Sequence, residues 1–387
     1  MLRIKDISLF QFKNYPNAAF AFHERIVGIC GKNGVGKTNL LDALYYLCFT
    51  KSYFSRSDQQ AVFRGSVEPG GATGSSGATG FRTGAGFGGV TGPAGFRLEG
   101  HFEKEGKITD LTAILRETGK KEFLANGEAY EKFSRHIGRF PCVIIAPDDI
   151  QIVTGTSEER RRFLDALLSQ LDPVYLQQLI DYNKILQQRN GFLKSLTERR
   201  LTDKGLLEVY DEQLVRTGDA IFSRRRQFLS GFLPLAGRYY TLIAGAEEPV
   251  ALGYESQLLF GHFAELLRQG LDRDLALQRT GVGIHRDDIG LTYADLPFKT
   301  MASQGQRKSL LFALKLAEYE TLKREKGFAP LLLLDDVFEK LDEFRMRNLL
   351  DRVCVQDDGQ IFITDTHAER IRAEMDGLGV QYQIVGL

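Results

Sequence analysis

The chain of 387 residues is long enough for two or three domains, and its 43% hydrophobic content supports a sizeable buried core. It has 50 basic and 50 acidic residues, so its formal net charge is zero, which excludes a protein whose overall field attracts its partners. Any binding of nucleic acid therefore depends on local basic patches and should be sensitive to salt.

The four cysteines indicate a reducing environment. They are far apart and lie in apolar stretches, without the paired spacing of a zinc site or a redox dithiol, at Cys30, Cys48, Cys142 and Cys354. No stretch approaches the roughly 20 apolar residues of a membrane span, and the first residues alternate like a strand, unlike a signal peptide. We therefore expect a cytoplasmic protein without a membrane partner.

Apolar and alternating runs predict three strands at the start, over residues 2–12, 18–22 and 26–30. The third leads into a glycine-rich loop, Gly31–Thr38 (GKNGVGKT), and a predicted helix over Lys37–Phe49. Glycine accepts backbone angles that are forbidden to other residues, so consecutive N–H groups can converge on phosphate oxygens. A chance glycine-rich turn is the alternative, but the flanking strand and helix favour a phosphate-binding loop.

This loop predicts that the chain binds ATP with Mg²⁺. Lys37 would reach the β- and γ-phosphates and take part in catalysis, Thr38 would ligate Mg²⁺, and the helix N-terminus would add its partial positive charge. The predicted nucleotide contacts cover the loop and the residue that follows it, namely Gly31, Lys32, Asn33, Gly34, Val35, Gly36, Lys37, Thr38 and Asn39.

The composition changes abruptly over residues 69–95, where glycine recurs at every third position in two runs. The register breaks between the runs and proline is scarce, which excludes a collagen helix. We interpret this segment as a flexible surface insertion before a predicted strand over 96–102. Further strands follow, ending with one over Cys142–Ala146.

From Ser157 to about Phe232, apolar residues recur at three- and four-residue spacing. This pattern predicts an arm of a few helices, too short for long antiparallel coiled coils. A mixed region over 238–300 includes a predicted helix near 257–271. We divide the chain into the N-terminal part of an ATPase head over 1–150, a helical arm domain over 151–275 and the C-terminal part of the head over 276–387.

The last part of the chain alternates predicted helices and strands, which is typical of a sheet that carries a phosphate-binding loop. The predicted elements are helices over 305–323 and 342–355 and strands over 331–334 and 360–364. Asp335 and Asp336 follow the four leucines of the first of these strands. Asp335 would hold Mg²⁺ and Asp336 would orient the attacking water. A strand with a solvated acidic turn is the alternative, and the phosphate-binding loop elsewhere in the chain argues against it.

A third motif, Ser303-Gln304-Gly305-Gln306, stands at the start of a predicted helix. A serine and a glycine at a helix N-terminus form an anion site, although the first loop already provides one for the γ-phosphate. Two chains could then share each nucleotide, so that Ser303 and Gly305 of one subunit cap the ATP held by Lys37 of the other. An ordinary capping box between Ser303 and Gln306 fits these residues equally well.

Together these segments resemble the RecF family of bacterial recombination mediators, ATPases related to SMC and ABC-type heads. The resemblance covers nearly all of the chain outside the glycine-rich insertion. Four segments carry it, over residues 31–47, 147–165, 281–288 and 303–342, and the second and third are specific to the family. It implies an α/β fold, with an ABC/SMC-type P-loop ATPase head of mixed sheet and helices plus a mainly helical arm domain.

The resemblance also implies roles for single residues. It places Ser303, Gln304, Gly305 and Gln306 in the ABC signature that contacts the nucleotide, Asp335 and Asp336 in the acidic pair, and Glu339, Leu341 and Asp342 in the D-loop that contacts a second subunit. His367 joins Lys37 and Asp336 among the catalytic candidates as a γ-phosphate switch. Thr366 is an alternative switch, and His367 could equally be an exposed loop histidine.

Two features depart from the family pattern. Asp336 stands where ABC and SMC heads usually carry glutamate, and its shorter side chain predicts slow ATP hydrolysis, suited to a switch. The Q-loop glutamine is not fixed, because Gln59 and Gln60 are adjacent.

The resemblance implies an ATP-dependent DNA-binding protein of gap repair and replication restart. ATP would close two heads into a homodimer on duplex or gapped DNA, and weak, DNA-dependent hydrolysis would release it. RecR, RecO and RecA are the implied partners, with RecA loaded onto single-stranded DNA in the SOS response. An SMC-like structural clamp with negligible turnover is the main alternative, and long coiled coils would favour it. Segments 147–165 and 281–288 argue against the ATPase subunit of an ABC transporter.

Three basic clusters on predicted helices could contact DNA phosphates, at Arg160–Arg162, Arg199–Arg200 and Arg224–Arg226. A solvated helix face is the alternative for each cluster. For Arg160–Arg162 the resemblance adds a third possibility, that these residues organise the head. No base-reading motif is present, so any DNA recognition should follow the backbone and not the sequence.

Overall fold

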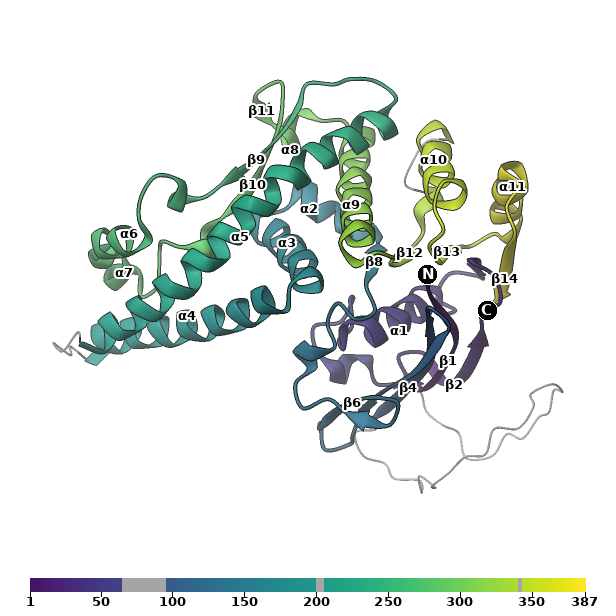
Figure 1. Cartoon of the computed structure of the whole chain (residues 1–387), viewed down its shortest axis with the longest axis horizontal. Coiled ribbons are helices and arrows are strands. Elements are labelled where there is room, and N and C mark those ends of the chain that lie inside the picture. The colour runs from purple at the N-terminus through teal and green to yellow at the C-terminus, as the bar shows by residue number, and fades with distance from the viewer. Residues whose placement is uncertain (65–94, 200–204, 340–342) are drawn as a thin grey trace.

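The computed structural model describes residues 1–64, 95–199, 205–339 and 343–387 (Figure 1). Nearly all of the predicted insertion at 69–95 lies outside the described residues, as do Arg200 and the D-loop candidates Leu341 and Asp342. Among the described helices, none is long and apolar enough to cross a membrane. The four cysteines are buried and free, as expected for reduced core residues.

A parallel sheet forms the centre of the head. Its strands lie in the order β14-β3-β13-β12-β8, with bounds Tyr382–Gly386, Ile26–Cys30, Ile361–Asp365, Leu331–Leu334 and Cys142–Ile145. Every residue of the four strands from β3 to β8 is buried, because helices or a second sheet cover both faces. The strands come from three distant parts of the chain, so the sheet unites them.

A second, antiparallel sheet packs on one side of the head. Its order is β2-β1-β4-β5-β6-β7, with bounds Tyr15–Ala21, Leu2–Phe12, Phe96–Lys104, Lys107–Leu115, Lys121–Ala125 and Glu128–Ala129. Helix α1, Lys37–Phe49, lies between the two sheets and is buried almost all round, which explains its nearly continuous apolar sequence (Figure 1). The predicted helix after the glycine-rich loop is therefore confirmed. Of the three strands predicted at the start of the chain, the first two correspond to the antiparallel pair β1 and β2, and the third, β3, belongs to the parallel sheet.

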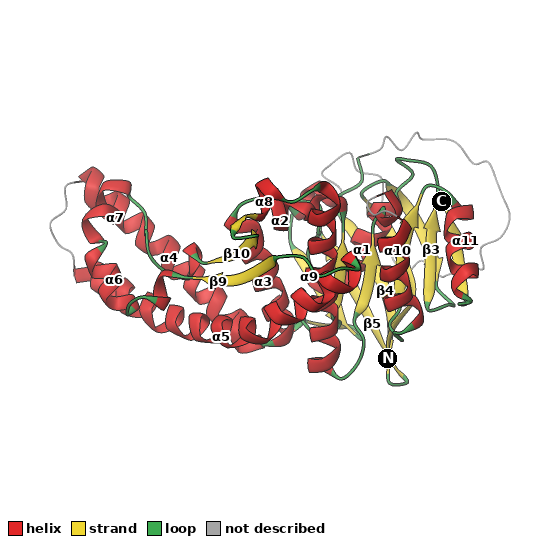
Figure 2. Ribbon diagram, turned by 90° about the horizontal axis from the view of Figure 1, so that it is seen from above, coloured by secondary structure: helices red, strands yellow, loops and turns green. Residues whose placement is uncertain are grey.

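The arm extends from one side of the head (Figure 2). It contains α2, Gln151–Thr154, α3, Ser157–Leu171, and the paired long helices α4, Pro173–Arg199, and α5, Gly205–Ala244. The short helices α6, Phe263–Gln269, and α7, Leu271–Leu277, lie at its far end (Figure 2). A small antiparallel sheet lies alongside, with strands β9, β10 and β11 at Val250–Glu255, Asp288–Tyr293 and Leu296–Pro297, followed by α8 at Phe298–Met301.

Two predicted boundaries in the arm were wrong. Helix α5 does not end near Phe232 but continues through Pro234 to Ala244. Its buried face continues past the proline to Ile243 and packs on helix α9, Gln304–Lys326, so tertiary contacts offset the missing hydrogen bond. The single helix expected near 257–271 is instead two short helices, and Gly270 separates them.

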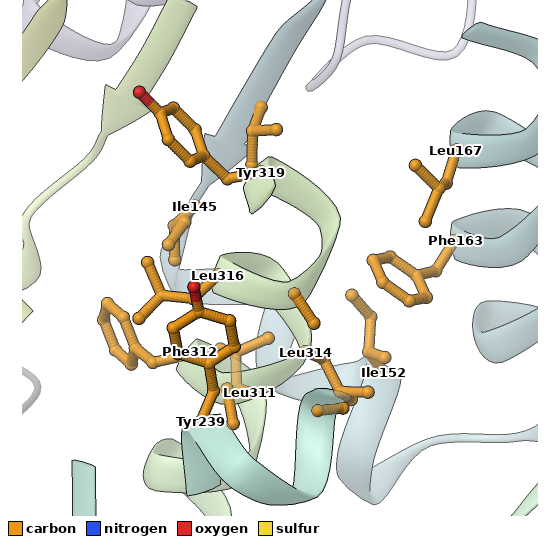
Figure 3. Close-up of a cluster of buried hydrophobic side chains, with 14 of the residues drawn as sticks. Ile145, Ile152, Phe163, Leu167, Tyr239, Leu311, Phe312, Leu314, Leu316 and Tyr319 are labelled. Carbon is orange, nitrogen blue, oxygen red and sulfur yellow. The ribbon is translucent and has the colours of Figure 1, made fainter. Parts of the chain in front are cut away.

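Helix α9 joins the arm to the head. Leu311, Phe312, Leu314, Leu316 and Tyr319 of this helix meet side chains of β8, α2, α3 and α5, including Ile145, Ile152, Phe163, Leu167 and Tyr239 (Figure 3). Burying one such side chain contributes about 1.5–3 kcal/mol. A continuous apolar core therefore fixes the helix that begins with Ser303-Gln304 relative to the parallel sheet.

The chain ends with a helix and strand that the sequence analysis did not predict, α11 at Ala368–Leu378 and β14. The helix predicted over 342–355 appears as α10, Glu343–Leu350, followed directly by a π-helical turn over Asp351–Val355. Strand β14 pairs with β3 and lies at the edge of the parallel sheet.

Candidate functional site

The order of the parallel strands brings the predicted motifs together. Strand β13 lies between β3 and β12, so the carboxyl ends of all three strands meet at one edge. The Gly31–Thr38 loop follows β3, and Asp335 follows β12. Thr38 Oγ1 lies 3.0 Å from Asp335 Oδ2 and 3.1 Å from Oδ1, although the residues are 297 positions apart. The two motifs therefore form one site.

The backbone of the loop has the conformation that its glycines permit. Gly34 and Gly36 have φ angles of 83° and 117°, in the left-handed region that favours glycine. A Cβ atom on Gly36 would also lie 2.5 Å from Asn14 Nδ2 and 2.8 Å from Tyr15 Oη. Any other residue at this position would strain the backbone and displace its neighbours.

Two residues that the sequence analysis missed hold the loop from the side. Asn14 Nδ2 donates to the Val35 carbonyl at 2.8 Å, and the Tyr15 hydroxyl donates to the Gly36 carbonyl at 3.0 Å. These bonds engage two carbonyl groups of the loop. The oxygen of a free carbonyl group would repel a bound anion. Asn39, a predicted nucleotide contact, donates its amide to Asn14 Oδ1 at 2.8 Å.

Lys37 is buried, and its ammonium group folds over its own loop. Its Nζ donates to the carbonyls of Gly31 at 2.7 Å and Lys32 at 3.1 Å. This places a positive charge against the loop that is predicted to bind phosphate, where it would pair with phosphate oxygens.

Asp335 is buried at the end of β12 and accepts hydrogen bonds from two threonines. Besides Thr38, Thr364 Oγ1 donates to Asp335 Oδ1 at 2.8 Å. Burial is the largest influence on the Asp335 carboxyl and raises its pKa, and the neighbouring Asp336 adds to this. The threonine hydrogen bonds and Lys37 act in the opposite direction. A nearby divalent cation would favour the ionised form.

The Thr38 hydroxyl and the Asp335 carboxylate fit Mg²⁺, a hard ion that takes one or two carboxylates and completes its shell with phosphate oxygens and water. Within the described part of the chain, no group of three or more His, Cys, Asp or Glu side chains is arranged to hold a metal ion.

Asp336 adopts a left-handed backbone conformation, with φ of 48°. Such a conformation costs about 1 kcal/mol or more outside glycine, and aspartate tolerates it better than most residues. Its N–H donates to Thr364 Oγ1 at 2.9 Å, which fixes the strand end. Thr364, at the end of β13, was not predicted to belong to the site, and it contacts both acidic residues.

The two switch candidates, Thr366 and His367, follow β13 and form a pair. Thr366 Oγ1 lies 2.8 Å from His367 Nδ1, and the His367 N–H donates to Asp365 Oδ1 at 2.6 Å. The His367 side chain is 66% exposed. These residues therefore stand at the same sheet edge as the acidic pair, with the imidazole directed towards solvent.

Ser303 and Gln306 form the capping box that the sequence analysis offered as an alternative. Ser303 Oγ accepts from the Gln306 N–H at 3.2 Å, and Gln306 Oε1 accepts from the Ser303 N–H at 2.8 Å. Ser303 and Gln304 are exposed at the start of α9. Among the contacts of the described residues, none joins Ser303–Gln306 to the Gly31–Asn39 loop of the same chain.

The Q-loop candidates lie in the 3₁₀ turn Asp58–Ala61, and both are exposed. Gln60 Oε1 accepts from the Arg56 N–H at 3.0 Å, so its side chain is engaged locally. Gln59 Nε2 lies near Gly119, on the turn between β5 and β6. The structure places neither against Asp335.

A buried polar network joins helices α1 and α9. Asp149, in the 147–165 segment, accepts from the Tyr53 hydroxyl and from the Ala146 N–H, the latter at 2.8 Å. Lys315 Nζ of α9 lies 3.8 Å from Asp149 and 3.5 Å from Glu318. Burial raises the pKa of Glu318 to about 7, although Lys315 opposes the shift.

The same network continues to the helix that follows the phosphate loop. Asp42, buried on α1, accepts from the Tyr53 N–H at 2.7 Å and pairs with Lys13 Nζ at 2.6 Å. A chain of polar contacts therefore runs from α1, which begins with Lys37 and Thr38, to α9.

Several arginines of the basic clusters are committed to internal contacts. Arg160 pairs with both oxygens of Asp288, at 2.6 and 2.8 Å, and Arg161 donates to the Asp287 carbonyl at 2.6 Å. These bonds join the 147–165 and 281–288 segments, and a role of the three arginines in organising the head near the nucleotide stays a prediction. Arg225 is 1% exposed and pairs with Asp165 at 2.7 Å and Asp287 at 2.8 Å.

The remaining arginines of the clusters differ in exposure and in their partners. Arg162 is exposed and pairs with Glu158 and with Glu159, the latter at 3.2 Å, and Arg226 is exposed as well. Arg224 is half-buried and donates to Asp172 Oδ2 at 3.1 Å. A solvated helix face thus describes Arg162 and Arg226 but not Arg160 or Arg225.

Comparison with protein families gives a match over residues 3–384 to SMC_N, the RecF/RecN/SMC N terminal domain. The chain is 39% identical over 386 residues to DNA replication and repair protein RecF of Flavobacterium johnsoniae, covering 100% of each. It is 36% identical over 382 residues to the protein of the same name from Bacteroides thetaiotaomicron, covering 98% of this chain and 95% of that one.

Solved structures agree with the expected fold class. The structure of the recombination mediator protein RecF-ATP in the RecFOR pathway has a TM-score of 0.80 and 27% identity, covering 95% of this chain and 92% of that chain. An Smc head domain from Pyrococcus furiosus has a TM-score of 0.54 at 15% identity, covering 100% of this chain and 93% of that one. The second likeness shows the fold alone, which is that of an ABC/SMC-type ATPase head.

Proposed function

The chain belongs to the RecF family, and from this membership we propose that it is an ATP-dependent DNA-binding protein of recombinational gap repair and replication restart. The observation that carries the proposal is the contact between Thr38 and Asp335, because it assembles the phosphate loop and the acidic strand end into one site. One structural relative is named RecF-ATP, and this supports ATP as the nucleotide.

At this site, the loop N–H groups and Lys37 bind the β- and γ-phosphates, and Thr38 and Asp335 hold Mg²⁺. The metal ion supplies charge neutralisation on the phosphate oxygens. Asp336 orients the attacking water, and either Thr366 or His367 senses the γ-phosphate. The carboxylate of Asp336 reaches less far than glutamate, so turnover is slow and the protein acts as a switch.

The Ser303–Gln306 turn supports a shared site. Ser303 and Gln304 are exposed at the start of α9, and among the described residues the turn makes no contact with the Gly31–Asn39 loop of its own chain. In a head-to-tail homodimer each of two nucleotides would lie between the loop of one subunit and this turn of the other. The capping box is compatible with this role, because Ser303 Oγ accepts a hydrogen bond in it and keeps its own proton to donate to a phosphate.

ATP-driven closure of the dimer then holds duplex or gapped DNA, and slow hydrolysis releases it. The proposal includes RecR, RecO and RecA as partners, with RecA loading onto single-stranded DNA and the SOS response as the outcome. The relative named for the RecFOR pathway supports the first two of these partners.

An SMC-like clamp with negligible turnover is the second candidate, and one observation favours it. Helices α4 and α5 contain 27 and 40 residues and pack against each other, so the arm is longer than the sequence pattern indicated. The number of ATP molecules hydrolysed per dimer on DNA separates the two functions, because a clamp would retain DNA without measurable turnover.

Binding to gapped DNA tests the proposed function. With ATP the wild-type protein should bind a gapped duplex, and higher salt should weaken binding. Lys37→Met should lose this binding, because its loop lacks the charge that pairs with the phosphates. Equal binding of DNA by Lys37→Met and wild type, with and without ATP, would contradict ATP-dependent binding.

A further inference from the structure

An arginine lies directly against the glycine of the Ser303–Gln306 turn. Arg345, on α10, is half-buried, and its guanidinium covers the face of Gly305 on the first turn of α9. A Cβ atom built on Gly305 would overlap Arg345 Nη1 and lie 3.4 Å from Cζ. Any other residue at 305 would therefore displace the guanidinium.

The backbone gives no separate reason for a glycine at this position. Gly305 lies in the first turn of α9 and is not among the described glycines with positive φ. Glycine within a helix costs roughly 0.5–1 kcal/mol relative to alanine. What the structure shows at this position is the close approach of Arg345.

Neighbouring contacts hold α10 in this place. Phe344 packs against Gly245 at the end of α5, and Asn348 Nδ2 donates to the Leu242 carbonyl at 3.3 Å. On the other side of the turn, Gln306 Nε2 donates to Glu248 Oε2 at 2.6 Å. The arginine and the turn are thus positioned by the same end of the arm.

The positive charge of Arg345 affects the ionisation of Tyr240 at this end of the arm. Burial and a hydrogen bond to Glu248 raise the pKa of Tyr240, and Arg345 acts in the opposite direction. The Tyr240 hydroxyl donates to Glu248 Oε2 at 2.7 Å. Glu248 therefore binds two donors beside the turn, and the guanidinium adds a positive charge to the same cluster.

We propose that Arg345 completes the signature half of the shared site and contacts the γ-phosphate of the nucleotide held by a second copy of this chain. The inference rests on the proposed function, in which Ser303 and Gly305 face that nucleotide. A guanidinium in contact with Gly305 then lies at the same phosphate. Its planar donors match phosphate oxygens, and they would add to the N–H groups of the helix N-terminus.

The role in trans predicts which step fails in a variant. Arg345→Ala should bind ATP to its own loop with unchanged affinity, but ATP-dependent dimerisation and hydrolysis should fall by about tenfold or more, as for loss of a charge-assisted contact. Arg345→Lys should restore only part of the loss, since an ammonium group cannot bind in a bidentate manner. Arg347→Ala is the matched control, because Arg347 lies on the same helix and is exposed.

A mixing experiment distinguishes action on the partner's nucleotide from a structural role. Arg345→Ala and Lys37→Met proteins, each with strongly reduced hydrolysis alone, are combined with ATP, and hydrolysis is measured. One of the two sites in the mixed dimer then pairs an intact loop with an intact signature, so activity should return to as much as half the wild-type value. No return of activity would overturn the proposal, because a defect within the subunit's own site or fold leaves no intact site.

A parallel mixture separates this inference from the proposed function. Ser303→Arg blocks the turn itself and is mixed with Lys37→Met in the same way. If that mixture regains hydrolysis and the Arg345→Ala mixture does not, the shared site stands and Arg345 has no part in it. If neither mixture regains hydrolysis, the shared site and the role of Arg345 are both wrong.

Discussion

Thr364 donates its hydroxyl proton to Asp335 at 2.8 Å and accepts the N–H of Asp336 at 2.9 Å. One side chain of β13 therefore fixes both acidic residues at the end of β12. Thr364→Val keeps the shape of the side chain but leaves a carboxylate oxygen and a backbone N–H with one partner fewer. Loss of a partner from such buried groups costs about 1–3 kcal/mol.

We expect Thr364→Val to lower the free energy of unfolding by that amount and to slow hydrolysis more than it weakens ATP binding, because Asp336 loses its fixed orientation. Urea denaturation and steady-state ATPase assays check the two effects. Thr364→Ser retains the hydroxyl and should stay close to wild type in hydrolysis. If the valine and serine variants hydrolyse ATP equally fast, the hydroxyl does not position the acidic pair.

The central arginine of the Arg224–Arg226 cluster should contribute to stability and not to DNA binding. Arg225→Met would leave Asp165 and Asp287 without their shared cation, and breaking such a buried pair costs about 3–5 kcal/mol. Its exposed neighbour provides the control, since Arg226→Ala should change the free energy of unfolding by no more than about 0.5 kcal/mol. Equal urea midpoints for the two variants would disagree with the buried network.

The raised pKa of Glu318, about 7, predicts a dependence of stability on pH. In the folded protein this carboxyl binds its proton more tightly than in the unfolded chain. Its contribution to stability is therefore fully present below the unfolded value of 4.5 and is lost as the pH rises through about 7. Relative to Glu318→Gln, the wild type should lose stability between pH 5 and 8. A difference in unfolding free energy that stays constant over this range would contradict the shift.

The motifs of the site could be predicted from sequence because each is local. The loop from Gly31 to Thr38 and the strand before Asp335 carry their glycine and leucine patterns in a few consecutive residues. Thr364, Asn14 and Tyr15 could not be found in this way. The role of Thr364 depends on which strand lies between β3 and β12, and the order of strands in a sheet cannot be predicted from one segment of the sequence. The roles of Asn14 and Tyr15 depend on the turn that packs against the loop.

Several features of the arm also could not be predicted from the sequence. The arginine triplets look alike in sequence, yet Arg225 is buried among carboxylates and Arg226 is exposed, because successive residues of a helix point to different sides. Pro234 is a stop signal by its own chemistry, and the packing of α5 on α9 overrides it. Strand β14 is short, partly exposed and at a sheet edge, so its apolar pattern is weak.

The exchange of Asp336 separates ATP binding from hydrolysis. Asp336→Asn should bind ATP and stop turnover, because an amide cannot accept the proton of the attacking water, so closed dimers should accumulate. Lys37→Met is the opposing control, since it should lose about 10- to 100-fold in ATP affinity and remain monomeric.

Sizing chromatography of Asp336→Asn with ATP and Mg²⁺ tests the shared site most directly. We expect a dimer in ATP, a monomer without nucleotide, and retention of gapped DNA by the dimer fraction. A monomer in saturating ATP would contradict the claim that two copies of this chain enclose each nucleotide.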